Sequence, residues 1–187
     1  FLGLLAILVE LYTLKSYTHL VGISPSVIKQ IKRLVRGKCL NLVYTGVDPS
    51  CFGAQGPEQD YILYFGRLDT YTKGIDLLLK AFLLIASKHP GVRLVLAGRG
   101  TAERMEELRS LCVELGAEER VEILGPVSDS RKQALFGGAL FNCMPSRYEG
   151  WGIAAIEAGA AEKAIVGTRI PGLTDAIQHN TTGLLVP

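Results

Sequence analysis

Residues 61–97 read YILYFGRLDTYTKGIDLLLKAFLLIASKHPGVRLVLA, and this stretch decides the fold. Tyr61–Phe65 and Arg93–Ala97 are short apolar runs typical of buried strands. Between them the apolar residues recur at helical spacing, at Ile75, Leu78, Leu79, Phe82, Ile85 and Ala86. A strand, a helix and a second strand in this order are typical of a crossover between parallel strands.

The same alternation continues to the end of the chain. Further strands are predicted over residues 121–124, 140–144, 164–167 and 184–186, and further helices over 105–115 and 153–161. The sequence therefore predicts an α/β domain in which helices flank a parallel sheet. Ligands of such open sheets bind beyond the carboxyl ends of the strands, so the loops that follow strands are the ones to inspect.

The composition is that of an ordinary globular protein. Of the 187 residues 48% are hydrophobic and 20% are charged, and the formal net charge is +2. These values exclude a disordered or collagen-like chain and a strongly basic nucleic-acid-binding protein. The cysteines Cys39, Cys51, Cys112 and Cys143 lack the spacing of a metal site, and each is predicted to be a buried thiol in a cytoplasmic protein.

The chain is predicted to have three parts. Residues 1–48 should form a helix ending near residue 17, a strand over 19–23, a helix over 25–36 and a strand over 39–44. Residues 49–59 are rich in Gly and Pro and are predicted to be a linker, and residues 60–187 should form the α/β domain. The apolar residues 1–14 are interrupted by Glu10 and too few to span a bilayer, which argues against a membrane segment or a signal peptide. Because the chain starts within a predicted helix and ends on a predicted strand with no closing helix, it reads as a fragment of a longer protein, truncated at both ends.

The predicted helix over residues 25–36 and the residues that follow it are basic. The cations are Lys29, Lys32, Arg33, Arg36 and Lys38. A solvated helix face and a site for an anionic surface, including the inner face of a membrane, are both compatible with this pattern.

The loop after the strand 61–65 carries a pair of cations. Arg67 and Lys73 lie six residues apart, next to Gly66 and Gly74. Such cations can converge on one anionic group that approaches the backbone closely. Taken alone, the pair is equally compatible with a solvated loop.

The loop after the strand 140–144 reads Pro145-Ser146-Arg147-Tyr148-Glu149-Gly150-Trp151-Gly152 and leads into a predicted helix. Gly150 and Gly152 would let a phosphate reach the first amides of that helix. Glu149 lies at the mouth of this site, and Glu157 lies eight positions further along the helix among small and apolar residues, where a carboxylate needs a partner. The two carboxylates are therefore too far apart to share one proton-transfer centre, but they could bind two ends of a long ligand.

These features together match one kind of ligand. The cations and the helix N-terminus would bind a diphosphate, and the carboxylates would accept hydrogen bonds from hydroxyl groups on either side of it. A nucleotide-sugar has a hydroxyl-rich unit at each end and a diphosphate between them. The sequence therefore predicts a nucleotide-sugar site.

The same residues resemble the C-terminal half of the retaining GT-B glycosyltransferases of family 4. The matching segments are Phe65–Leu68 with Lys73-Gly74, Leu96–Gly98, Val121–Gly125, Pro145–Gly152, Glu157-Ala158 and Gly183–Pro187. The spacing of Glu149 and Glu157 corresponds to the EX7E motif of that family. The resemblance implies a Rossmann-like domain, the C-terminal domain of a GT-B fold, with residues 1–48 as a truncated remnant of the N-terminal domain.

The resemblance also implies roles for individual residues. Arg67 and Lys73 would bind the donor diphosphate and Glu149 would contact the transferred sugar, which makes these the expected catalytic residues. Glu157 would bind the ribose, and the backbone between Gly125 and Val127 would hold the base. The remaining residues expected at the donor site are Gly66, Gly98, Gly150, Trp151 and Gly152, with Trp151 standing where Phe is common in the family.

The implied reaction is the transfer of a sugar from a nucleotide-diphosphate-sugar to a sugar or lipid-linked acceptor, with retention of configuration and without a metal or cofactor. By the same resemblance, a fragment of this length should be inactive without a full N-terminal domain. Neither the base nor the sugar nor the acceptor can be identified from the sequence.

Other classes of function fit less well. The segment Gly98-Arg99-Gly100 resembles a dinucleotide-binding turn, but Glu103 stands where that motif needs Gly, and the chain contains no GxxxxGK[ST] motif of nucleoside-triphosphate enzymes. A nucleotide-sugar-binding module without catalysis stays open as an alternative, followed by a GT-B epimerase or phosphorylase.

Overall fold

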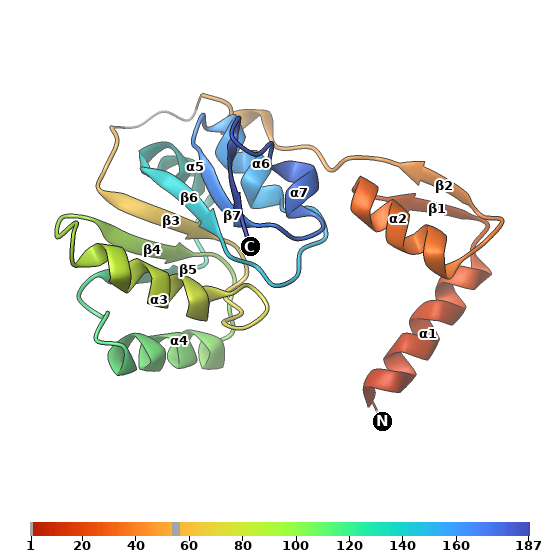
Figure 1. Cartoon of the computed structure of the whole chain (residues 1–187), viewed down its shortest axis with the longest axis horizontal. Coiled ribbons are helices and arrows are strands. Elements are labelled where there is room, and N and C mark those ends of the chain that lie inside the picture. The colour runs from red at the N-terminus through yellow and green to blue at the C-terminus, as the bar shows by residue number, and fades with distance from the viewer. Residues whose placement is uncertain (1, 54–56) are drawn as a thin grey trace. The chain divides into compact units, whose positions relative to one another are not determined.

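The computed structural model describes residues 2–53 and 57–187, and contacts divide the chain into the units Phe1–Gly46 and Val47–Pro187 (Figure 1). Phe1, where the first predicted helix starts, and residues 54–56 of the predicted linker lie outside the described residues. No helix in the described ranges is long and apolar enough to cross a membrane.

The unit Phe1–Gly46 contains the elements predicted for residues 1–48. They are α1 (Leu2–Ser16), β1 (His19–Gly22), α2 (Pro25–Leu34) and β2 (Cys39–Leu42), and β1 pairs with β2 in parallel. Helix α2 begins where the sequence indicates, because the Ser24 side chain accepts a hydrogen bond from the Val27 amide at 3.2 Å and Pro25 occupies the first turn. The prediction that every cysteine is buried is wrong for Cys39, which lies exposed on β2 because this small parallel pair covers few of its side chains, and Cys143 is only partly buried.

The unit Val47–Pro187 contains the predicted parallel sheet. Its strands are β3 (Tyr61–Phe65), β4 (Arg93–Ala97), β5 (Val121–Gly125), β6 (Phe141–Met144), β7 (Ile165–Thr168) and β8 (Gly183–Val186). Its helices are α3 (Ile75–Ala86), α4 (Ala102–Glu114), α5 (Asp129–Gly138), α6 (Ile153–Ala160) and α7 (Leu173–Ala176). The strand order is β5-β4-β3-β6-β7-β8 with parallel pairing throughout, so the predicted α/β fold class is confirmed.

Helices cover both faces of this sheet, with α3 and α4 on one face and α5, α6 and α7 on the other (Figure 1). The alternation of side chains along a strand explains the two layers of core. In β3, Ile62 and Tyr64 pack with α3 and α4, whereas Tyr61 and Leu63 pack with α5, α6 and α7. A strand that is buried on both sides reads as a continuous apolar run, which is why Tyr61–Phe65 was predictable.

The first part of the predicted linker packs against the sheet domain. Residues Pro49–Cys51 form a 3₁₀ turn that begins at Asp48, whose carboxylate accepts a hydrogen bond from the Ser50 amide at 2.8 Å. Ser50 Oγ in turn accepts a hydrogen bond from Gln133 Nε2 of α5 at 2.7 Å, and Cys51 is buried. The Gly and Pro content indicated a linker, but a turn with its own cap and a buried side chain is part of the domain surface.

Candidate functional site

The site lies at the carboxyl edge of the sheet between β3 and β6. From β3 the chain proceeds outward to β4 and β5, and it then returns to place β6 on the other side of β3. Open α/β sheets bind their ligands at such a reversal of strand order, next to the loops that follow β3 and β6. These are the two loops that the sequence singled out.

The β3 and β6 loops pack against each other through their backbones. Gly74 has a φ of 66°, and a Cβ at this position would run into the carbonyl oxygen of Pro145. Within the first loop, Asp69 Oδ1 accepts a hydrogen bond from the Thr72 amide at 2.9 Å, and this bond is the main reason that the pKa of Asp69 lies below its ordinary value. The first loop therefore has a fixed shape and a fixed distance from the second.

Lys73 and Glu149 meet at this contact between the loops. Lys73 Nζ lies 2.5 Å from Glu149 Oε2, and the two side chains are only 12% and 16% exposed. Two residues that are 76 positions apart in the sequence thus form a partly buried ion pair. The structure brings together one predicted cation and one predicted carboxylate of the donor site.

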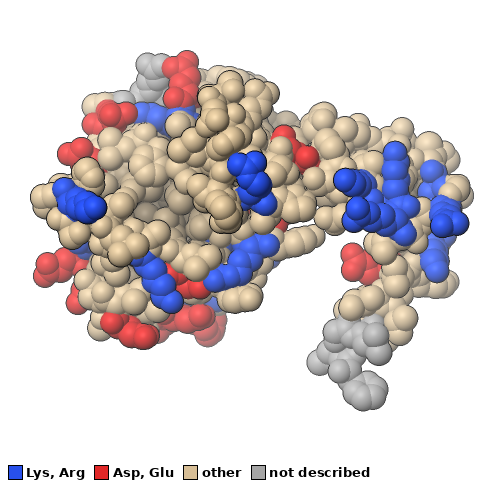
Figure 2. All heavy atoms as spheres, viewed as in Figure 1, with Lys and Arg blue, Asp and Glu red and all other residues tan. Residues whose placement is uncertain are grey.

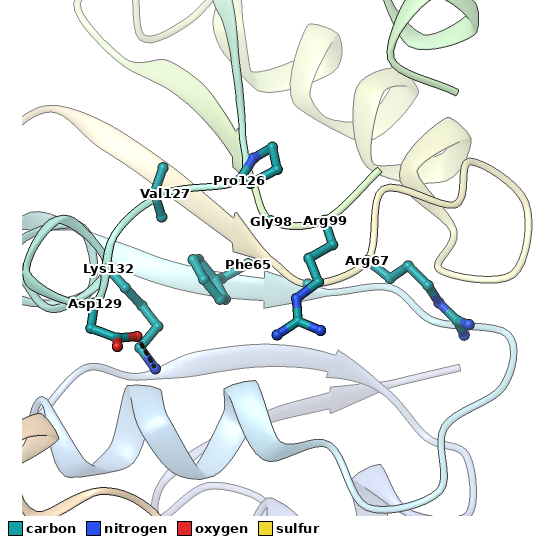
Figure 3. Close-up of a pocket in the computed structure, with 9 residues that line it drawn as sticks. Phe65, Arg67, Gly98, Arg99, Pro126, Val127, Asp129 and Lys132 are labelled. Atoms are coloured by element: carbon teal, nitrogen blue, oxygen red, sulfur yellow. Dashed lines mark ion pairs between the residues drawn. The ribbon is translucent and has the colours of Figure 1, made fainter. Parts of the chain in front are cut away.

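A cleft of about 450 Å³ opens beside the ends of β3, β4 and β5. It is lined by Phe65, Gly66, Arg67, Gly98, Arg99, Pro126, Val127, Asp129 and Lys132 (Figure 3). Gly98 has a φ of 130°, and a Cβ there would run into the Gly66 carbonyl oxygen, so glycine is required for the two strand ends to approach. Of the predicted site residues, Gly66, Arg67, Gly98 and Val127 share this cleft, and the carbonyl of Gly125 accepts a hydrogen bond from the Gly98 amide at 2.8 Å.

The cleft is positively charged. Figure 3 shows the side chains of Lys132, Phe65, Arg99 and Arg67 following one another along its opening. Within residues 2–53 and 57–187, neither the Arg67 nor the Arg99 guanidinium takes part in a hydrogen bond or an ion pair. Guanidinium groups bind phosphate oxygens in a bidentate manner, so this end of the cleft can hold a diphosphate.

Glu157 pairs with Lys132, which reaches from α5 to α6. Lys132 Nζ lies 3.0 Å from Glu157 Oε1 and 3.8 Å from Asp129 Oδ1. The side chains of Lys132 and Glu157 are 18% and 12% exposed, respectively. Burial lowers the pKa of Lys132, but the hydrogen bond and the charge of Glu157 outweigh it and leave this pKa above its ordinary value. The partner that the sequence required for Glu157 is therefore Lys132.

The predicted N-terminal end of α6 has an open cap. Gly152 is the cap residue, with φ 75° and ψ 51°, and no side chain caps the first turn. Such a turn presents its amides to an anion. Trp151 is 7% exposed, so its side chain belongs to the core, and Gly150 is half-buried. Gly150, Trp151 and Gly152 do not line the cleft beside Arg67; they follow Glu149 in the neighbouring loop.

Sequence reasoning missed Arg99, Lys132 and Arg147. Arg99 and Lys132 follow the ends of β4 and β5, so the strand-end rule that selected the other loops would also have found them. For Lys132 there was a second signal, because Ser128 followed by Asp129 is typical of a helix N-terminus, and Ser128 indeed accepts a hydrogen bond from the Arg131 amide at 3.3 Å. Arg147 contacts the β3 loop, which no sequence pattern indicated.

The fold and the site define an α/β domain with a positively charged cleft at the carboxyl ends of its strands, and sequence comparison assigns the family. Residues 53–187 match the family of glycosyl transferases group 1, so the chain belongs to this family. An uncharacterized glycosyltransferase of Methanocaldococcus jannaschii is 34% identical over 163 residues, which cover 79% of this chain and 40% of that protein. The D-inositol 3-phosphate glycosyltransferase of Pseudarthrobacter chlorophenolicus is 35% identical over 143 residues, covering 75% of this chain and 32% of that protein. The chain thus spans about a third to two-fifths of the length of these relatives.

Solved structures share the fold. The sucrose-phosphate synthase from Thermosynechococcus elongatus superposes with a TM-score of 0.84 at 26% identity, covering 96% of this chain and 48% of that one. Anabaena HepE in complex with UDP and glucose superposes with a TM-score of 0.79 at 21% identity, covering 90% of this chain and 49% of that one.

Proposed function

We propose that the chain is the donor-binding half of a retaining GT-B glycosyltransferase of family 4, and that its ligand is a nucleotide-diphosphate-sugar. The observation that carries the proposal is the Lys73–Glu149 ion pair of 2.5 Å, whose lysine lies on the same loop as Arg67, one of the cations that line the cleft. That loop supplies cations for a diphosphate, and its contact with Glu149 brings a carboxylate for sugar hydroxyls to it. Membership in the glycosyl transferases group 1 supports the same reaction.

In this proposal each part of the donor has its own residues. Arg67 and Lys73 bind the diphosphate, with the α6 amides after Gly152 on its other side, and Glu149 accepts hydrogen bonds from the transferred sugar. Glu157 binds the ribose, and the backbone of residues 125–127 holds the base. Glu149 and Glu157 each lie against a lysine ammonium in the structure, at 2.5 Å and 3.0 Å respectively, which holds each carboxylate in place.

The proposed role of the cations in the reaction follows from charge. As the bond to the sugar breaks, negative charge grows on the departing diphosphate and the anomeric carbon becomes positive. Cations at that oxygen therefore stabilise the transition state more than the bound donor. At about 4 Å and an effective dielectric constant of about 20, one contact contributes up to roughly 4 kcal/mol. Because Arg67 and Lys73 supply this charge, the proposed reaction needs no cofactor or metal.

The acceptor side belongs to the part of the relatives that this chain does not span. We propose a sugar or lipid-linked acceptor and a cytoplasmic reaction at the inner face of a membrane. Figure 2 shows Lys and Arg side chains gathered on the unit that contains α2, and Lys29, Lys32, Arg33 and Arg36 are all exposed. Sedimentation with vesicles that contain anionic lipids, compared with neutral vesicles, tests this contact.

The donor site is tested by calorimetric titration of the chain with UDP, GDP and ADP, and then with the corresponding nucleotide-sugars. We expect one base to bind, and we expect Arg67→Ala and Lys73→Ala to weaken binding. Arg93→Ala and Lys80→Ala are matched controls, because Arg93 pairs with Glu122 at the opposite end of β4 and Lys80 is exposed on α3. In a protein of the relatives' full length, loss of either site cation should slow transfer by up to roughly 1000-fold, and NMR of the product should show retention. Failure of every nucleotide to bind, or wild-type transfer by either variant, contradicts the proposal.

A further inference from the structure

Arg147 lies two residues before Glu149, and its side chain turns away from the cleft toward the β3 loop. Its guanidinium donates two hydrogen bonds to the Asp76 carboxylate, from Nη1 to Oδ1 at 2.7 Å and from Nη2 to Oδ2 at 2.8 Å. Nη1 also donates to the Tyr71 carbonyl oxygen at 2.6 Å, and the guanidinium lies 4.3 Å from the centre of the Tyr71 ring. The planar fork of an arginine satisfies all of these contacts at once, which a lysine cannot do.

These contacts join the two loops of the donor site. Tyr71 belongs to the loop that carries Lys73, and Asp76 lies in the first turn of α3, immediately after that loop. The main chain adds a further bond, because the Arg147 amide donates to the Thr72 carbonyl oxygen at 3.0 Å. Arg147 therefore ties the segment that carries Lys73 to the segment that carries Glu149, from a side that does not line the cleft.

The Lys73–Glu149 ion pair cannot hold these two segments together while a donor is bound. In the proposed function, the Lys73 ammonium turns to the diphosphate and the Glu149 carboxylate turns to the sugar, so their direct bond is weakened at the moment when their spacing matters. The contacts of Arg147 involve neither of these groups, so a bound donor would not compete for them. Asp76 keeps its negative charge throughout, since the hydrogen bonds from Arg147 hold its pKa below the ordinary value.

We propose that Arg147 is a positioning residue, which holds Lys73 and Glu149 at the spacing that the diphosphate and the sugar require without touching the donor itself. This inference rests on the proposed function. The residues proposed for the base and the ribose lie on β5, its following loop and α6, and the side-chain contacts of Arg147 are to Tyr71 and Asp76. Loss of Arg147 should therefore weaken the binding of the diphosphate and leave the binding of the nucleoside unchanged.

The test compares nucleoside diphosphate with nucleoside monophosphate binding in the whole chain. Calorimetric titration with UDP and UMP, and with the GDP/GMP and ADP/AMP pairs, gives the ratio of the two dissociation constants. We expect Arg147→Met to reduce the preference for the diphosphate by about tenfold, with little change in the affinity for the monophosphate. Arg147→Lys keeps the charge but not the fork and should restore only part of the preference.

Two further variants make the result specific. Arg93→Met removes an arginine from the Arg93–Glu122 pair at the other end of the sheet and should leave the preference unchanged. Asp76→Asn should reproduce the effect of Arg147→Met, and the double variant should be no worse than the stronger single one, because both remove the same contact. If Arg147→Met does not fold, Asp76→Asn and Arg147→Lys answer the same question.

The outcomes separate the inference from the function on which it rests. Equal losses for diphosphate and monophosphate, or no loss for either, overturn the positioning role and leave the donor site intact. Failure of the wild-type chain to bind any of the nucleotides overturns the proposed function, and the inference with it.

Discussion

Removal of the Lys132 ammonium should destabilise the domain far more than removal of an ordinary surface cation. In Lys132→Met, the Glu157 carboxylate would remain only 12% exposed and would lose its 3.0 Å partner. Breaking one side of a buried ion pair costs about 3–5 kcal/mol, and the remaining exposure of this pair puts the expected loss nearer 2–3 kcal/mol. For a domain of this size, such a loss lowers the Tm by about 5–10 °C.

The chain offers a matched control for this experiment. Lys163 Nζ also lies 3.0 Å from a carboxylate, that of Glu58, and Lys163 is 17% exposed, but the Glu58 side chain is 59% exposed. Water can solvate Glu58 after Lys163→Met, so that variant should lose no more than about 1 kcal/mol. Both substitutions replace a lysine by methionine. They differ in how deeply the carboxylate that loses its lysine is buried.

Urea unfolding followed by circular dichroism measures both variants. A double variant of Lys132→Met and Glu157→Gln should recover most of the lost stability, because no unpaired charge remains. The reasoning is refuted if Lys132→Met unfolds within about 0.5 kcal/mol of the wild type, or if the double variant loses as much as the sum of the single ones.

Three other predictions follow from the same structure. Gly98→Ala should cost more than about 2 kcal/mol in urea unfolding, because the added methyl runs into a backbone carbonyl at a positive φ. The pKa of Asp76 is lowered by Arg147, so this ion pair stabilises the fold above the unfolded pKa of about 3.8, and the difference in stability between wild type and Arg147→Met should shrink as pH falls through the folded pKa. Cys39 is exposed and should react with a thiol reagent in the native state, whereas Cys112, which is buried and has a raised pKa, should react only after unfolding, as mass spectrometry of the labelled peptides can show.

The fold was predictable because buried strands and helices require apolar residues in characteristic patterns along the sequence. Strands that are covered on both faces, such as Tyr61–Phe65, must be apolar throughout, and α3 must present apolar residues at helical spacing. The end points of these elements follow from local chemistry, and most lie within a residue or two of the prediction. The exposure of Cys39 was not predictable, because it depends on how little of β2 the small N-terminal unit covers.

The site was predictable only in part, for a physical reason. Glycines and charged residues beside strand ends indicate a ligand, and they led to Lys73 and Glu149. The partner of Glu157 depends instead on how α5 packs beside α6, and the contact between Arg147 and Asp76 depends on the path of two loops. Such contacts are set by tertiary packing and have no fixed spacing along the chain.

The glycines at the strand ends also limit how this domain can diversify. Gly74 and Gly98 each face a backbone carbonyl across a gap too small for a methyl group, so any residue with a side chain would clash at these two positions. Arg99 and Pro126, by contrast, are exposed at the rim of the cleft and can be exchanged without disturbing the strands. Under the proposed function, substitutions at the rim would change which nucleotide the cleft accepts, whereas the backbone contacts at Gly74 and Gly98 would be retained.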